Sequence, residues 1–197
     1  FYRGEHKLVA DYFVGKKAQR AEVSLWVGAL SFLGQIDEAE TQFERSKVKL
    51  SAKELAACRF YLGVGFCRHS FYEKGRRYFT ENLIQFRKER NFEILFYVHQ
   101  GLAFYRYFQC RYKDAVFHSA ASLKSANRSD FLYGKMLGSE LNGYSLVQQG
   151  EISRGLEQLK LSARLAKSMG SGSWQQAMQI SVLLFEAQYG LKPSSIL

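Results

Sequence analysis

The stretch 32-FLGQIDEAETQF-43 places Gly34 between an apolar run and an acidic segment. A glycine there can end a helix, because it adopts the left-handed backbone conformation that closes many helices. Three positions follow at fixed offsets: Ile36 at +2, Ala39 at +5 and Phe43 at +9. The large +2 residue can pack under the turn, the tiny +5 residue lets two helices approach closely, and the +9 residue shares their face. The stretch therefore predicts a helical hairpin centred on Gly34.

The same order of residue types recurs along the chain. Ser70, Cys110 and Gly150 repeat the pattern, and Gly190 follows as a fifth anchor, with spacings of 36, 40, 40 and 40 residues. Fixed spacing of this kind is typical of stacked helical repeats. Cys110 is poorly suited to the left-handed conformation, so we expect a different type of turn there.

The repeat resembles the tetratricopeptide repeat. That family favours a small residue seven positions before the anchor, which Gly63, Ala103 and Gly143 match, and a leucine eight before, which Leu62 and Leu102 match. The units exceed the family's usual length of about 34 residues and lack its closing proline. They look like the long, proline-less variants of regulatory and scaffold proteins. The resemblance implies an all-α fold of antiparallel helix hairpins stacked as a right-handed α-solenoid.

The spacing gives a domain plan for the whole chain, which we read as one repeat domain, residues 1–197. The expected parts are an outer helix of a truncated upstream repeat (1–15), hairpins over 18–50, 52–90, 92–128 and 130–169, and a terminal helix (173–190). An outer helix without its inner partner, in a chain that starts with Phe1, leads us to expect part of a longer polypeptide.

Composition narrows the class of protein. The chain is 47% hydrophobic, which excludes a disordered segment, and it lacks the long uncharged apolar run of a membrane span. The net charge is +10, and most of the excess lies in residues 59–128, with 13 basic and 5 acidic residues. This centre favours an acidic partner, although a solvated basic face explains it equally simply. Cys58, Cys67 and Cys110 are expected to be reduced, buried thiols of a cytoplasmic protein.

Catalytic motifs are not found in the sequence. It contains no phosphate-binding glycine loop, no HExxH and no GxSxG, and His6, His69, His99 and His118 fall on different predicted helices. We therefore predict a non-catalytic protein without a metal or cofactor.

The inner helices of such a solenoid line a concave groove, and their register predicts which side chains face it. The predicted groove residues are Phe60, Arg68, Tyr97, Gln100, Phe104, Tyr107, Phe108, Glu140 and Tyr144. Family members that hold a terminal carboxylate use several basic and amide side chains here, of which only Arg68 is present. We expect an aromatic groove for an apolar peptide or an amphipathic helix. Core packing is an equal alternative for Phe104 and Tyr144.

A second surface is basic. The outer helix of the second hairpin and its exit carry Lys74, Arg76, Arg77, Arg87, Lys88 and Arg90 as a convex strip. A nucleic-acid-associated regulator is the alternative function that this strip suggests, and nucleic acid is the less favoured partner because no known recognition module is present.

The terminal helix is apolar over most of its circumference, unlike a helix that caps a repeat array. We predict that another chain covers it, most simply in a homodimer through Trp174, Met178, Leu184 and Phe185. The alternative is that a tail including Ile196 and Leu197 folds back over it.

Overall fold

The computed structural model describes residues 6–15, 18 and 22–193, and these form helices and turns without a strand. The helices are α1 (His6–Phe13), α2 (Val23–Phe32), α3 (Ile36–Ser46), the 3-10 helix η2 (Lys47–Lys49), α4 (Ala52–Arg68), α5 (Tyr72–Phe86), α6 (Phe92–Phe108), α7 (Tyr112–Arg128), α8 (Leu132–Gln148), α9 (Ile152–Ser168) and α10 (Gly172–Gln188). The all-helical prediction is confirmed. The helix expected to open the 18–50 segment begins at Val23, and the helix expected to close the 52–90 segment ends at Phe86.

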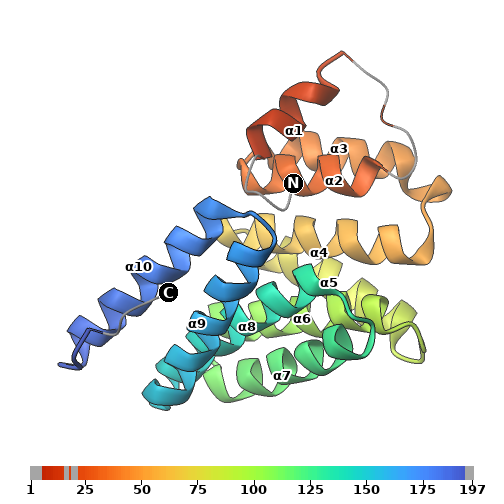
Figure 1. Cartoon of the computed structure of the whole chain (residues 1–197). Coiled ribbons are helices and arrows are strands. Elements are labelled where there is room, and N and C mark those ends of the chain that lie inside the picture. The colour runs from red at the N-terminus through yellow and green to blue at the C-terminus, as the bar shows by residue number, and fades with distance from the viewer. Residues whose placement is uncertain (1–5, 16–17, 19–21, 194–197) are drawn as a thin grey trace.

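The helices pack in the order of the sequence (Figure 1). The odd-numbered helices α3, α5, α7 and α9 each contact the helices immediately before and after them. The even-numbered helices α2, α4, α6 and α8 also contact one another in succession. The chain is therefore a repeat-like array of neighbouring helices. Its even-numbered helices form one row and its odd-numbered helices another.

Seven turns share one geometry, which explains the regular spacing. At Gly150 (φ 94°) the N–H of Glu151 donates to the Leu146 carbonyl at 2.9 Å, and the N–H of Gly150 donates to the Val147 carbonyl at 3.0 Å. This pair of bonds is the Schellman motif, which satisfies the last carbonyls of a helix. The same longer bond closes the turns at residues 34, 70, 110, 130, 170 and 190. From residue 110 onward such a turn follows every 20 residues.

The expectation for Cys110 was wrong on two counts. Its φ is 56°, so its turn is of the same left-handed type as the others, and Arg111 N–H closes it on the Arg106 carbonyl at 2.9 Å. The helices on both sides are held by packing, and this outweighs the steric cost of about 1 kcal/mol for a side chain in this conformation. Cys110 is also exposed, whereas Cys58 and Cys67 are buried as expected.

Small residues bring neighbouring helices close together. A Cβ on Gly155 in α9 would lie 2.8 Å from the Gly143 carbonyl oxygen in α8, and a Cβ on Gly75 in α5 would lie 2.8 Å from the Gly63 carbonyl oxygen in α4. No ordinary Cβ contact is that short. In these two pairs the small residues at −7 and +5 from the anchor therefore face each other, and the close approach predicted for the +5 position is confirmed there.

Two helix starts are fixed by local capping. Ser51 accepts a hydrogen bond from the backbone N–H of Glu54 while the Glu54 carboxylate accepts from the backbone N–H of Ser51, which forms a capping box before α4. Asn91 accepts from the N–H groups of Glu93 and Ile94 before α6. Within the described residues, no helix combines the length and apolarity needed to span a membrane.

Candidate functional site

A cavity lies against the even-numbered helices. Two adjoining hollows of about 310 Å³ and 80 Å³ share Phe32, Arg68, Glu140 and Trp174, and together we name them the central cavity. Its remaining lining residues are His6, Phe60, Val64, Phe104, Leu137, Ser173, Ala177 and Met178. The lining therefore comes from α1 and from all five even-numbered helices. Side chains far apart in the sequence meet there around one carboxylate and one guanidinium.

Glu140 is the electrostatic centre of this cavity. It is half-buried on α8, and desolvation raises the pKa of its carboxyl to about 7, although Arg68 and the Trp174 side chain both favour the charged form. No ion pair within 4 Å joins it to Arg68 in the described structure. Burial also lowers the pKa of His6, with Arg68 acting in the same direction, so this imidazole is neutral near pH 7. The cavity thus holds a carboxylate whose charge is only partly compensated.

Arg68 packs on an aromatic ring rather than on Glu140. It is exposed at the end of α4, and its guanidinium carbon lies 5.7 Å from the centre of the Phe32 ring. This distance is within the range of cation–π attraction. The His6 ring stacks on the Phe32 ring, with centroids 4.6 Å apart. Phe32 therefore carries a neutral ring and a cation at the mouth of the cavity.

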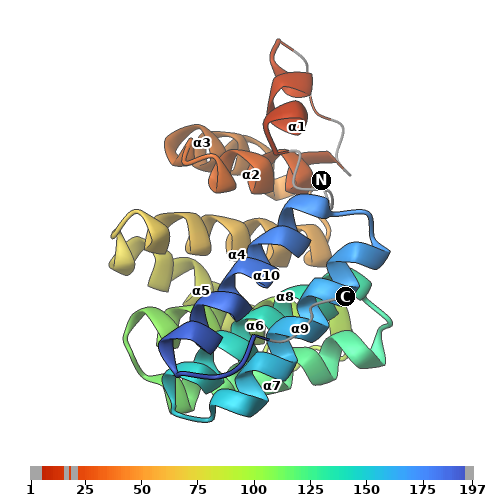
Figure 2. The ribbon, with the colours of Figure 1, turned by 60° about the vertical axis from the view of Figure 1, so that its left-hand side comes forward.

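The two ends of the described chain meet at this place. Trp174, at the start of α10, lies edge-on to Phe32, at the end of α2, with ring centroids 6.1 Å apart. Figure 2 shows α10 beginning beside the N-terminal helices and running past the other even-numbered helices. The array curves enough to bring α10 to α2, and this contact adds α10 to the lining of the cavity.

The structure brings together some of the predicted groove residues. Phe60, Arg68, Phe104 and Glu140 all line the central cavity, with Phe60 buried at its floor. Half-buried positions around the same row of helices are occupied by Tyr107, Phe108 and Tyr144. The prediction of a binding role for these seven residues stays a prediction.

Gln100 is a correction, because it is buried in the core, whereas Tyr97 is largely buried but lines a separate hollow with Ala57 and Tyr61, and its binding role stays a prediction. Gln100 is fully buried, its side-chain amide donates to the Leu137 carbonyl at 2.9 Å, and its amide oxygen accepts from the Ser122 hydroxyl at 2.6 Å. It therefore ties α6 to α7 and α8. The register predicted a groove position, but it did not include the close packing of adjacent even-numbered helices, which covers this face.

The predicted basic strip is exposed but partly neutralised. Lys74 lies 3.8 Å from Glu40, Arg76 lies 2.6 Å from Glu73 and Arg77 lies 2.9 Å from Glu81. The other three members are exposed and take part in none of the described ion pairs: Arg87, Lys88 and Arg90. Half of the strip is therefore paired with carboxylates of the same surface.

The predicted self-association residues lie in different environments. Met178 is buried, and Trp174 and Phe185 are half-buried against Phe32 and Tyr144 respectively. Leu184 is the exposed member, at 64%. It belongs to an apolar face of α10 whose exposed members are Ala177, Ile180, Leu183, Leu184 and Ala187. Residues 194–197, which include the tail expected to fold back, lie outside the described residues, and homodimerisation stays a prediction.

Metal-binding groups are sparse in the described ranges. Nowhere in residues 6–15, 18 and 22–193 do three His, Cys, Asp or Glu side chains come together as a metal site would require. His99 on α6 and His118 on α7 face each other, with their Nδ1 atoms 3.4 Å apart. That distance fits one imidazole N–H donating to the other ring, and burial lowers the pKa of both groups. The pair links two helices as neutral rings.

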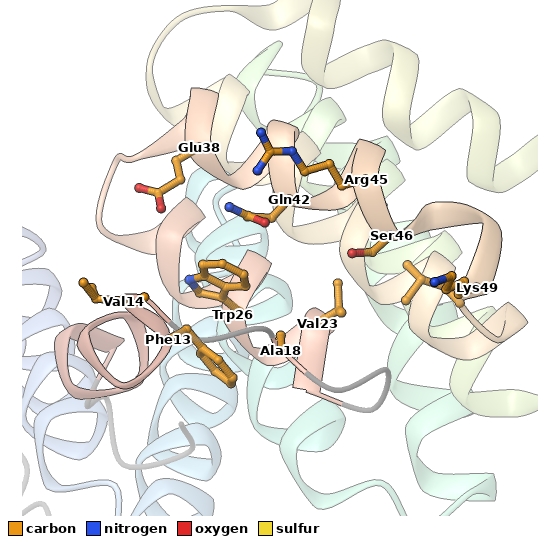
Figure 3. Close-up of a pocket in the computed structure, with 12 residues that line it drawn as sticks. Phe13, Val14, Ala18, Val23, Trp26, Glu38, Gln42, Arg45, Ser46 and Lys49 are labelled. Carbon is orange, nitrogen blue, oxygen red and sulfur yellow. The ribbon is translucent and has the colours of Figure 1, made fainter.

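A larger hollow of about 750 Å³ lies between α1, α2 and α3, with Phe13 and Trp26 at its base, Gln42 and Arg45 on α3 and Lys49 on η2 (Figure 3). Its lining residues Gly15 and Ala18 adjoin residues 16–17 and 19–21, which lie outside the described part of the chain.

Sequence reasoning missed Phe32, and it placed Trp174 at a different surface. Phe32 precedes the anchor Gly34 by two residues, which is the same offset as Arg68 from Ser70, so the register contained a signal for it. The role of Trp174 depends on the curvature of the array, for which the sequence has no local signal. Among known proteins, no family model, curated sequence or solved structure matches the chain.

Proposed function

We propose that this protein is a non-catalytic interaction module whose central cavity and adjoining α10 face bind an apolar peptide or an amphipathic helix of a partner. The observation that carries the proposal is the lining itself. Aromatic and aliphatic side chains from α2, α4, α6, α8 and α10 converge on one cavity, and an exposed apolar face of α10 continues from it. Grooves of this composition recognise helices through apolar anchors one turn apart.

The proposal includes the finer architecture. The helix pairs α2–α3, α4–α5, α6–α7 and α8–α9 are read as antiparallel hairpins of a right-handed, tetratricopeptide-like α-solenoid. The close approach of Gly63 to Gly75 and of Gly143 to Gly155 supports that reading, since these are the small positions of the family pattern. The even-numbered helices are then the inner row, and the central cavity is the concave side.

The repeat register identifies the part of α10 that belongs to this surface. Leu184 stands 40 residues after Tyr144 and 80 after Phe104, and Phe104 lines the cavity. Ala177, two turns before Leu184 on the same face, also lines it. Leu184 is therefore the exposed apolar anchor that extends the cavity along α10.

A peptide selection tests this function. Wild-type protein is used to select binders from a displayed library of helix-forming peptides, and their affinities are measured by fluorescence anisotropy. Leu184→Lys is expected to weaken binding by about thirtyfold, the equivalent of a hot-spot residue worth about 2 kcal/mol. The matched control is Ile84→Lys on α5, because Ile84 is 68% exposed and Leu184 64%.

The control is expected to bind within about twofold of wild type, since α5 lies in the other row of helices. Light scattering on both variants separates loss of binding from a change in oligomeric state. Peptides that bind Leu184→Lys as well as wild type, or that are lost with Ile84→Lys, would place the binding surface elsewhere.

The nucleic-acid alternative rests on the three strip residues without a described ion pair, Arg87, Lys88 and Arg90. It predicts binding that weakens steeply between low and physiological salt, with a slope set by the number of phosphate contacts. We rank it second, because the paired half of the strip has carboxylates beside each cation.

A further inference from the structure

We propose that the partner inserts a cationic side chain, an arginine or a lysine, into the central cavity, where it pairs with Glu140 among the rings of Phe32, Phe104 and Trp174. The inference rests on the proposed function, since it specifies the chemistry of the same site. It concerns the cavity alone and is independent of the basic strip on the other row of helices.

The lining of the cavity favours a cation at Glu140. Around Glu140 the cavity presents aliphatic and aromatic side chains, including Phe60, Phe104 and Leu137, and Arg68 is the one other charged side chain among its lining residues. A half-buried carboxylate in such apolar surroundings loses part of its hydration. A cation brought to it restores the lost stabilisation, whereas an anion adds to the unfavourable charge.

The aromatic rings of the cavity also suit a cation. Arg68 already lies over Phe32 at 5.7 Å from the ring centre. Tryptophan and phenylalanine faces attract guanidinium and ammonium groups at such distances. The indole N–H of Trp174 is buried without a hydrogen bond of normal geometry, and the same side chain stabilises the Glu140 carboxylate. The wall of the cavity can therefore hold a cation between a ring and a carboxylate.

Arg68 is the charged group of the cavity that would attract an anion. Its guanidinium is exposed and keeps its hydration, whereas the Glu140 carboxylate is half-buried. An anionic ligand at Arg68 would have to approach the partly compensated carboxylate in the same cavity. The volume of about 310 Å³ accommodates one long side chain and is at the lower end of small-ligand sites.

The titratable groups facing Glu140 determine how cation binding depends on pH. They are His6 on α1, Arg68 on α4, Tyr107 on α6 and Tyr144 on α8. Burial lowers the pKa of His6 below its usual value and raises those of the two tyrosines above theirs, so these three stay neutral between about pH 7 and pH 8. Glu140 is then the group whose charge changes most, and cation binding strengthens as pH rises.

The test uses small probes, so it does not need the natural partner. N-acetyl-arginine methylamide is titrated against wild-type protein and compared with its neutral isostere N-acetyl-citrulline methylamide and with N-acetyl-glutamate methylamide. Tryptophan fluorescence reports binding, and Trp174→Phe supplies the blank for the signal of Trp26. At pH 8 and 0.15 M salt the arginine probe is expected to bind at least about fivefold more tightly than the citrulline probe.

Between pH 7 and pH 8 a group with a pKa of about 7 goes from about half to roughly nine tenths ionised, so the arginine affinity is expected to rise by nearly twofold. Glu140→Gln, which keeps the shape of the side chain, is expected to lose both the preference for arginine and the pH trend. Arg68→Gln is expected to keep both, because it removes a competing cation.

Three results would overturn the inference: equal binding of arginine and citrulline, no binding of any probe, or preference for the glutamate probe with affinity that falls as pH rises. The last would assign the cavity to an anion on Arg68. The peptide selection with Leu184→Lys is scored separately, so failure of the cation site and failure of the proposed function give different patterns.

Discussion

Replacing Gly155 by alanine tests whether the packing of α8 on α9 depends on close backbone contact. In an open helix this change stabilises, because alanine has the higher helix propensity by about 1 kcal/mol. Here the new Cβ would lie 2.8 Å from the Gly143 carbonyl oxygen, 2.8 Å from the Val147 nitrogen and 2.5 Å from the Val147 Cγ2. Two of these neighbours are backbone atoms, so α8 and α9 must separate to admit the methyl group.

The magnitude follows from the balance of these terms. Overpacking against atoms that cannot move aside costs about 3 kcal/mol, at the upper end of the usual range. Subtracting the propensity gain leaves a net destabilisation of about 2 kcal/mol. For a chain of this length that corresponds to a fall in Tm of about 4 to 8 °C.

Thermal melts followed by circular dichroism would measure the effect, with Gly172→Ala as the matched control. Gly172 is also helical, in α10, but a Cβ there has nothing within 4 Å. The control is expected to keep or slightly raise Tm. If Gly155→Ala melted at or above wild type, the close contact between α8 and α9 would be refuted.

Three other changes probe the turns, the core and the cavity. Cys110→Gly is expected to stabilise the fold by about 1 kcal/mol in urea titration, because φ is 56° at this position, and a lower midpoint would contradict the steric argument. Gln100→Leu is expected to cost about 1–2 kcal/mol, since the Leu137 carbonyl and the Ser122 hydroxyl lose buried partners, and an unchanged midpoint would show that they re-pair. The folded-state pKa of Glu140 is raised to about 7, so its contribution to stability is complete below the usual glutamate pKa and is lost as pH rises through about 7. Glu140→Gln should flatten this dependence in urea titrations across that range, and an identical pH profile would argue against the raised pKa.

Much of the fold could be predicted because one local pattern repeats. The anchors mark helix ends, and every one of them has a positive φ in the structure, from Gly34 to Gly190. The error at Cys110 is instructive. Intrinsic preference argued against a left-handed cysteine, but the helices on each side are fixed by packing and impose the turn. The equivalent turns at Asp130 and Gly170 were not identified as anchors, because the residues that follow them do not repeat the pattern seen after the other anchors.

The site was predictable only in part. Register alone places Arg68 and Glu140 on the row that lines the cavity. It cannot tell which members of that row are covered by neighbouring helices, so Gln100 was misplaced. The contact between Phe32 and Trp174 depends on the curvature of the array, which accumulates from a small rotation between each helix pair and the next. No single stretch of sequence encodes that curvature, so the contribution of α10 to the cavity was not predicted.

The contact between Phe32 and Trp174 also bears on how the array unfolds. An open array of repeats frays from its ends, because each terminal unit is held by one neighbour. Here the last helix touches the second across 142 positions of sequence, so loosening one end removes support from the other. Amide hydrogens in α2 and α10 should then exchange in a single cooperative opening, and Trp174→Ala should separate it into two.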